Sequence, residues 1–210
     1  TLPDYQTQCG CADIMMHTME RYFVLEDTME ITDKIAQDVM KNVMKYAKIL
    51  KKDPENYEAR AEIMWCGSLS HNGLTGCGTC GGDWATHLIE HELGGMFDVA
   101  HGAGLAAVWG SWARYVMDEK PERFAQFAVD VMGVEESDDV KSTALKGIEA
   151  VEEFYRMIEM PTNMKELGIN PTDEQIKDMA MKATNHDTQQ LGAFKKLSAK
   201  DLVEIYKTAK

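Results

Sequence analysis

The chain has 210 residues, of which 44% are hydrophobic and 27% charged, and its formal net charge is −13 at pH 7. A chain of this length can bury a substantial core as a single domain. The negative charge argues against a nucleic-acid partner and against binding to an anionic membrane surface. No apolar stretch approaches the roughly 18 residues needed to span a bilayer, so no membrane partner is expected either.

Apolar residues recur with helical spacing over residues 31–47, and charged residues occupy the opposite face. We therefore predict a helix there, capped by Thr28 or Thr32 and ended by Asp53-Pro54.

A second helix is predicted from Pro54, with Asp53 as its cap, to about His71. The segment that follows, 71–82, has five glycines in twelve residues and predicts a loop whose backbone turns sharply or approaches another group closely.

Asp83 is predicted to cap a helix that carries His87 and His91 and stops near Gly94-Gly95. Another helix is expected to begin near His101. Further helices are predicted at about 121–132, 138–159, 171–184 and 198–208, with Thr172 and Ser198 as possible caps. Strand-like alternation is essentially absent. The predicted fold class is all-α, a multi-helix bundle formed by one domain over residues 1–210.

Asp13 and His17, like His87 and His91, are four residues apart, and this spacing places two side chains about 40° apart on one helical face. Two such helices facing each other could bring three imidazoles and a carboxylate to one point. That donor set suits Fe²⁺ or Zn²⁺. His101, at a predicted helix start, is an additional candidate ligand.

The chain has five cysteines, an odd number, and its first residues lack the features of a signal peptide. Together these observations predict reduced thiols and a cytoplasmic location. Cys77 and Cys80 form a CxxC pair, but no second such pair and no βαβ context accompanies it. We interpret both as small residues of the glycine-rich loop and His71 as a structural residue.

Two other motifs compete with this interpretation. His87-Leu88-Ile89-Glu90-His91 matches the H-x-x-E-H signature of zinc hydrolases, in which Glu90 would be the general base. His186-Asp187 resembles a metal-binding dyad, but only 23 residues follow it, so a solvated turn is the better interpretation. A third hypothesis is a non-catalytic interaction module, which an exposed apolar face would favour.

The run Asp83-Trp84-Ala85-Thr86-His87-Leu88-Ile89-Glu90-His91-Glu92-Leu93, with Asp98-Val99-Ala100-His101-Gly102 after it, closely resembles the iron-containing alcohol dehydrogenase family. The resemblance is greatest to the butanol dehydrogenase and aldehyde reductase branch. Ala12–Tyr22 looks like the first metal-binding helix of that family. The resemblance extends over essentially the whole chain.

This resemblance implies that Asp13, His17, His87 and His101 are the four metal ligands. It moves His91 out of the coordination shell and toward the nicotinamide and substrate, where it could relay a proton or instead hydrogen-bond a core carbonyl. The implied metal is Fe²⁺ or Zn²⁺, and the implied reaction interconverts a primary alcohol and an aldehyde with NAD(P)(H).

Family members also carry an N-terminal Rossmann-like nucleotide-binding half, and no part of this sequence has its βα pattern or its glycine-rich loop after a strand. We therefore expect the helical, metal-binding C-terminal domain of the dehydroquinate synthase-like fold alone. The isolated chain is expected to be inactive, with most cofactor-binding residues elsewhere, and the full-length protein to be a homo-oligomer.

Overall fold

The computed structural model describes residues 2–26 and 30–210. Within these ranges the chain forms nine α-helices, and its only strand-like pairing is an isolated bridge between Leu191 and Leu197. The helices are α1 (Asp4–Tyr22), α2 (Glu30–Lys52), α3 (Tyr57–His71), α4 (Ala85–Phe97), α5 (His101–Val116), α6 (Pro121–Asp130), α7 (Val140–Met157), α8 (Asp173–Ala183) and α9 (Ala199–Ala209), with short 3₁₀ segments η1 (Leu74–Gly76) and η2 (Met117–Glu119). The predicted all-α fold is confirmed.

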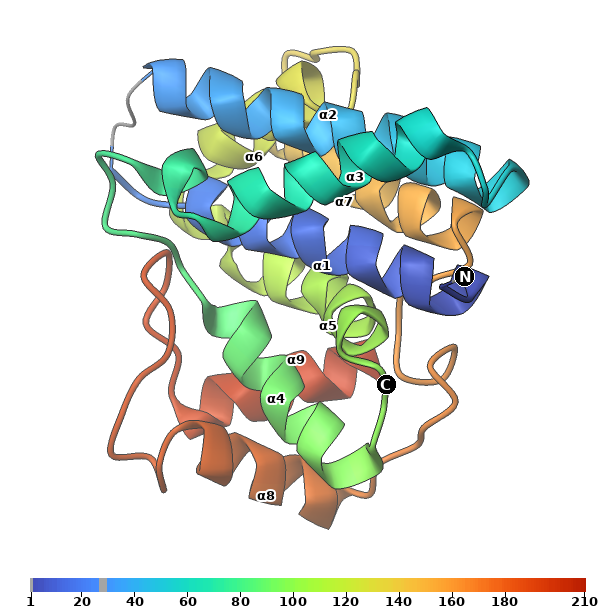
Figure 1. Ribbon diagram of the computed structural model, residues 1–210. Helices are drawn as coiled ribbons and strands as arrows, with labels where there is room; N and C mark the ends of the chain where they lie inside the picture. The colour runs from blue at the N-terminus through green and yellow to red at the C-terminus, as the bar shows by residue number, and fades with distance from the viewer. Residues whose placement is uncertain (1, 27–29) are drawn as a thin grey trace.

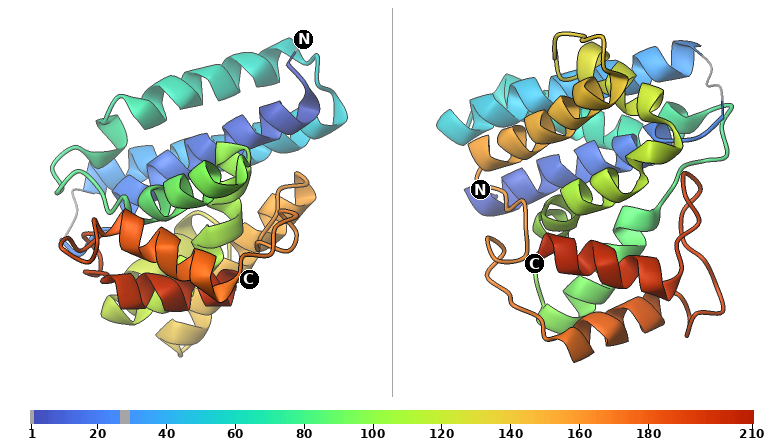
Figure 2. Two further views of the ribbon diagram at one scale, coloured as in Figure 1. Left: turned by 90° about the horizontal axis from the view of Figure 1, so that it is seen from below. Right: turned by 180° about the vertical axis from the view of Figure 1, so that it is seen from behind.

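Helix α5 lies at the centre and contacts α1, α4, α7 and α9 (Figure 1). On one side α1, α2 and α3 pack against one another, and α6 and α7 cover them from behind, as the rear view in Figure 2 shows. On the other side α4, α8 and α9 form a second group. Because α5 joins the two groups, its first residues stand where α1 and α4 come together.

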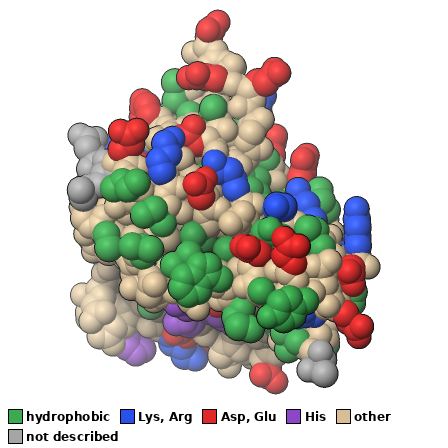
Figure 3. Space-filling view, turned by 45° about the horizontal axis from the view of Figure 1, so that its top comes forward, with side chains coloured by type: hydrophobic (Ala, Val, Ile, Leu, Met, Phe, Trp, Pro, Cys, Tyr) green, Lys and Arg blue, Asp and Glu red, His purple; other side chains and the backbone are tan. Residues whose placement is uncertain are grey.

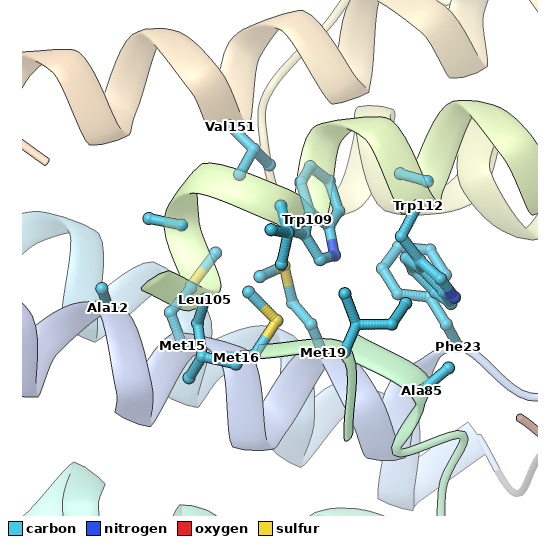
Figure 4. Close-up of a cluster of buried hydrophobic side chains, with 14 of the residues drawn as sticks. Ala12, Met15, Met16, Met19, Phe23, Ala85, Leu105, Trp109, Trp112 and Val151 are labelled. Carbon is cyan, nitrogen blue, oxygen red and sulfur yellow. The ribbon is translucent and has the colours of Figure 1, made fainter. Parts of the chain in front are cut away.

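The core between α1 and α5 is built from sulfur-containing and aromatic side chains (Figure 4). Met15, Met16 and Met19 of α1 are fully buried and lie near Leu105 and Trp109 of α5. Methionine side chains adapt to irregular spaces, so they can fill the core behind a helix whose other face carries polar residues.

The close approach of α1 and α5 depends on Gly102. A Cβ atom at this position would overlap the backbone carbonyl of Cys9, so only glycine fits without a shift of one helix. This contact positions His101, the residue just before Gly102, beside the face of α1 that carries Asp13.

The predicted start of α2 is only partly tested. Thr28 lies outside the described residues. Thr32 is not a cap, because α2 already begins at Glu30 and the Thr32 hydroxyl donates to the carbonyl of Cys77 at 2.9 Å. That bond ties the glycine-rich loop to α2.

Helix α3 begins three residues later than predicted. Its cap is Asn56, whose side chain accepts a hydrogen bond from the Ala59 amide, and not Asp53. The Asn56 amide instead donates to the carbonyl of Asp53, so Pro54 and Glu55 form a turn before the helix.

Both ends of α4 also differ from the prediction. The helix begins at Ala85 after Trp84, and Asp83 lies one residue before the cap position, where its carboxylate accepts from the amides of Ala85, Ala193 and Phe194. At the other end α4 continues through Gly94-Gly95 to Phe97. Gly94 serves packing rather than termination, because a Cβ there would lie 2.9 Å from Glu90 Oε1.

The later helices were predicted to within about two residues at most ends. Thr172 and Ser198 are confirmed as caps, each in a reciprocal capping box with a residue three positions on.

Hydrophobic side chains gather on one outer face of the molecule (Figure 3), and α3 contributes the exposed Tyr57, Met64 and Trp65. Among the described helices, none has the length and hydropathy needed to cross a bilayer.

Candidate metal centre

Three histidines surround one carboxylate oxygen. Asp13 Oδ1 lies 3.6 Å from Nε2 of His17, 3.7 Å from Nε2 of His87 and 3.5 Å from Nε2 of His101. The three rings come from α1, α4 and the first residue of α5 respectively. The structure therefore brings together all four residues that the sequence resemblance singled out.

These separations exceed the hydrogen-bonding range of about 2.7–3.2 Å. They are close to the distance of about 3.4 Å that separates two ligand atoms when each lies about 2.1 Å from one tetrahedral metal ion. Asp13, His17 and His87 each offer a donor atom within 4.8 Å of the others, while His101 forms a second such group with Glu90 and His91.

Two of the atoms that face each other are buried without a hydrogen-bond partner among the described residues: Asp13 Oδ1 and His87 Nε2. An unpaired buried polar atom normally costs free energy. A divalent cation between these atoms would satisfy both, and imidazole nitrogens with a carboxylate oxygen are donors that Fe²⁺ and Zn²⁺ accept. The residues present therefore fit such an ion.

Each of the two histidines from α4 and α5 is held from behind by a buried carboxylate. Glu20 Oε1 accepts from the backbone amide of His87 at 3.0 Å and lies 3.2 Å from its Nδ1. Glu90 Oε2 contacts Nδ1 of His101. A carboxylate on Nδ1 fixes the tautomer in which Nε2 carries the lone pair, which is the arrangement common behind metal-binding histidines.

The charges of the cluster shift its pKa values strongly. Burial raises the pKa of Asp13, but the attraction of the neighbouring His101, His87 and His17 imidazoles outweighs it and holds that pKa well below its usual range. The Asp13 and Glu90 carboxylates raise the pKa of His101 to about 10. Burial lowers the pKa of His17 to about 4, against the attraction of Asp13. His17 is thus neutral and ready to donate a lone pair at pH 7.

His91 does not join the group around Asp13. Its side chain is exposed, and its ring centroid lies 6.3 Å from that of His87 and 5.6 Å from that of His101. Although His87 and His91 share a helical face, the ring of His87 turns toward Asp13 and that of His91 stays outside. The role of His91 therefore stays a prediction.

Trp84 borders the cluster and was not among the predicted site residues. Its ring lies 5.4 Å from that of His17 and 5.3 Å from that of His87, and the guanidinium of Arg21 lies 4.5 Å from its centre. Trp84 has a φ of 64°, an uncommon conformation for a residue with a large side chain. The Gly81 carbonyl accepts from its indole N–H at 3.0 Å.

Glu20 and His71 were also missed as members of the site. Glu20 is seven residues after Asp13, so it shares the face of α1 with Asp13 and His17, and this spacing was a usable signal. His71 Nε2 lies 3.5 Å from Asp13 Oδ2. No local sequence pattern predicts that contact, because it depends on how α3 packs on α1.

The remaining candidates lie away from these contacts. Cys77 and Cys80 are exposed. In the loop that carries them, Gly76 lies against the side chain of Arg21. His186 and Asp187 are exposed in the turn after α8.

Comparison with known proteins identifies the fold and the family. Residues 7–210 match the family model described as "Fe-containing alcohol dehydrogenase family, C-terminal". The chain belongs to this family. It is 33% identical over 208 residues to NADH-dependent butanol dehydrogenase A of Clostridium acetobutylicum, and 31% identical over 211 residues to the NADPH-dependent aldehyde reductase YqhD of Escherichia coli.

Structural comparison agrees with this membership. The crystal structure of NADH-dependent butanol dehydrogenase A from Thermotoga maritima is similar over the whole chain, with a TM-score of 0.91 and 35% identity. These matches cover 99–100% of this chain but only 53% of each of the two curated relatives and 53% of the Thermotoga protein. It thus spans about half the length of the relatives it matches.

Proposed function

We propose that this chain is the metal-binding catalytic part of an NAD(P)(H)-linked dehydrogenase that interconverts primary alcohols and aldehydes. The observation that carries the proposal is the arrangement of three histidine Nε2 atoms around the buried, unpaired Oδ1 of Asp13. Membership of the family supports it, as do relatives named as butanol dehydrogenases and an aldehyde reductase.

Asp13, His17, His87 and His101 would hold Fe²⁺ or Zn²⁺. When bound, the ion supplies a Lewis acid for an alcohol or carbonyl oxygen, and the nicotinamide would donate or accept the hydride. Glu20 and Glu90 orient His87 and His101 from behind.

In this proposal His91 exchanges a proton between a bound substrate and solvent, and its exposure beside His101 supports that role. Small alcohols or aldehydes are the proposed substrates. The cytoplasmic location and the homo-oligomeric state stay predictions from the sequence.

The zinc hydrolase alternative is disfavoured by the position of Glu90. Only 1% of this residue is exposed, its carboxylate contacts His101 Nδ1, and Gly94 and Gly104 close over it. A general base must reach the water molecule that it activates. The Glu90 carboxylate instead contacts and orients the imidazole of His101. The interaction-module hypothesis stays a prediction, and the exposed apolar residues of α3 are the surface it would use.

The proposal is tested by metal analysis of the purified chain, loaded with Fe²⁺ without oxygen or with Zn²⁺ and then dialysed. We expect about one ion per chain, loss of that ion in an Asp13→Ala, His87→Ala double variant, and no loss in His186→Asn, which removes an exposed histidine elsewhere. Equal metal content in the unaltered chain and the double variant would contradict the ligand assignment.

Activity is tested on the longest protein that contains this sequence, with butanal and either NADH or NADPH. We expect aldehyde-dependent oxidation of the nicotinamide that depends on added metal and falls sharply in the double variant. The 210-residue chain alone, measured in the same assay, is expected to show none.

A further inference from the structure

His71 also has its side chain at the cluster, and it comes from the last position of α3. Its Nε2 lies 3.5 Å from Asp13 Oδ2, the carboxylate oxygen that does not face the other three imidazoles. Its ring centroid is 3.8 Å from that of His17, with an angle of 35° between the planes. The side chain is 44% exposed, so this flank of the cluster is open.

The tautomer of His71 follows from the groups around Nδ1. This atom lies 2.9 Å from the carbonyl oxygen of Gly67, which can only accept, so Nδ1 carries the hydrogen. The Ser70 hydroxyl donates to the same carbonyl at 3.0 Å, which leaves its oxygen free to accept from Nδ1 at 2.8 Å. In the neutral ring the lone pair is therefore on Nε2.

In the neutral ring a lone pair on Nε2 faces a carboxylate oxygen at 3.5 Å, which is electrostatically unfavourable unless a proton or a metal cation lies between the two atoms. The contact is also too long for a hydrogen bond. Asp13 thus has donor nitrogens on both sides: His17, His87 and His101 toward Oδ1, and His71 toward Oδ2.

Ordinary helix termination does not account for this arrangement. A histidine at the end of a helix often bonds a terminal carbonyl, and the contact with Gly67 is of this kind. That contact explains the position of Nδ1. The opposite side of the same ring packs on His17 and places Nε2 3.5 Å from Asp13 Oδ2, a contact that helix termination does not require.

We propose that His71 Nε2 is a further donor to the metal centre, on the Oδ2 side of Asp13. The inference rests on the proposed function, since it needs a metal held by Asp13, His17, His87 and His101. A fourth imidazole increases the preference of the site for Fe²⁺, Co²⁺ and Zn²⁺ over Mg²⁺, which prefers oxygen donors.

The test is Co²⁺ titration of the unaltered chain, His71→Leu, the control His186→Asn, and Asp13→Ala. Loss of one donor lowers the coordination number, and visible bands of Co²⁺ become more intense as its coordination falls toward four. We expect His71→Leu to bind Co²⁺ at least about tenfold more weakly, with intensified bands, and His186→Asn to match the unaltered chain. Far-UV circular dichroism verifies the fold, and His71→Gln replaces His71→Leu if that variant does not fold.

The unaltered chain provides a second readout that needs no variant. In proton NMR of the Co²⁺-loaded chain, each coordinated imidazole with a hydrogen on Nδ1 gives a strongly shifted exchangeable signal. Four such signals, from His17, His71, His87 and His101, support the proposal, and three contradict it.

The outcomes separate the two proposals. If His71→Leu or His71→Gln binds Co²⁺ with unchanged affinity and spectrum while Asp13→Ala does not bind, the role of His71 is wrong and the four-residue centre stands. If the unaltered chain itself binds no Co²⁺, the proposed function is wrong and this inference with it.

Discussion

The carboxylate of Glu90 contacts Nδ1 of His101 on the side of the ring opposite to Asp13, which lies 3.5 Å from Nε2. The imidazole is thus held between two acids, one buried behind it and one in the cluster. Gly94 and Gly104 leave room for Glu90, since a Cβ at either position would press on its side chain. The packing of α4 on α5 therefore orients a candidate metal ligand.

Glu90→Gln is expected to weaken metal binding by about 10- to 100-fold, because the amide keeps the shape of the side chain but loses the charge that makes His101 a better donor. Competition with a chromophoric chelator measures the change. Glu92→Gln, which removes the same charge from the same helix away from His101, is the control. Equal affinities for the Glu90 variant and the unaltered chain would show that Glu90 does not support the site.

Metal affinity should rise with pH. The pKa of His101 is raised to about 10, so at pH 7 this residue must lose a proton before Nε2 can donate to a metal. We expect the Zn²⁺ affinity to increase about tenfold per pH unit between pH 6 and 8.5. In Glu90→Gln the dependence should level off at lower pH, since one of the two acids that raise this pKa is gone. An affinity that is constant over this range would contradict the proposed role of His101.

Two glycine substitutions should change stability in opposite directions. Gly102→Ala places a Cβ on the Cys9 carbonyl and should lower the free energy of unfolding by about 1–3 kcal/mol or more. Gly10→Ala, also in a helix but with no atom within 4 Å of the added Cβ, should raise it by about 0.5–1 kcal/mol. Urea denaturation measures both. A neutral Gly102→Ala would mean that α1 and α5 do not approach as closely as described.

Asp83→Ala should lower the free energy of unfolding by about 2–3 kcal/mol. The buried carboxylate accepts from the amides of Ala85, Ala193 and Phe194, and the variant leaves these donors unpaired. Asp38→Ala, at a carboxylate that is 77% exposed, should stay within about 0.5 kcal/mol. Thermal or urea unfolding compares the two. Similar stabilities would show that Asp83 does not hold the start of α4 to the segment before α9.

Local rules predicted most helices well and failed where long-range contacts decided the ends. Thr172 and Ser198 cap their helices as expected, because the capping box involves only neighbours in sequence. Asp83 is not the cap residue of α4. Its carboxylate accepts from the backbone amides of Ala193 and Phe194, about 110 positions away in sequence, and this contact is not visible in the local pattern. The helix α4 continues past Gly94 to Phe97. The missing side chain of Gly94 leaves room for the Glu90 carboxylate, so this glycine is a packing residue and not a helix end.

The sequence by itself determined the fold class, because helical periodicity is a local property of the chain, and its motifs carried the family resemblance that implied the four residues proposed as ligands. Only the tertiary structure decided how closely His87 and His101 approach Asp13, that Glu20 and Glu90 stand behind two of these rings, and that His71 reaches the Oδ2 side of the carboxylate. These relations depend on the angles and separations at which α1, α3, α4 and α5 pack, and those are set by side chains buried throughout the core and by Gly102.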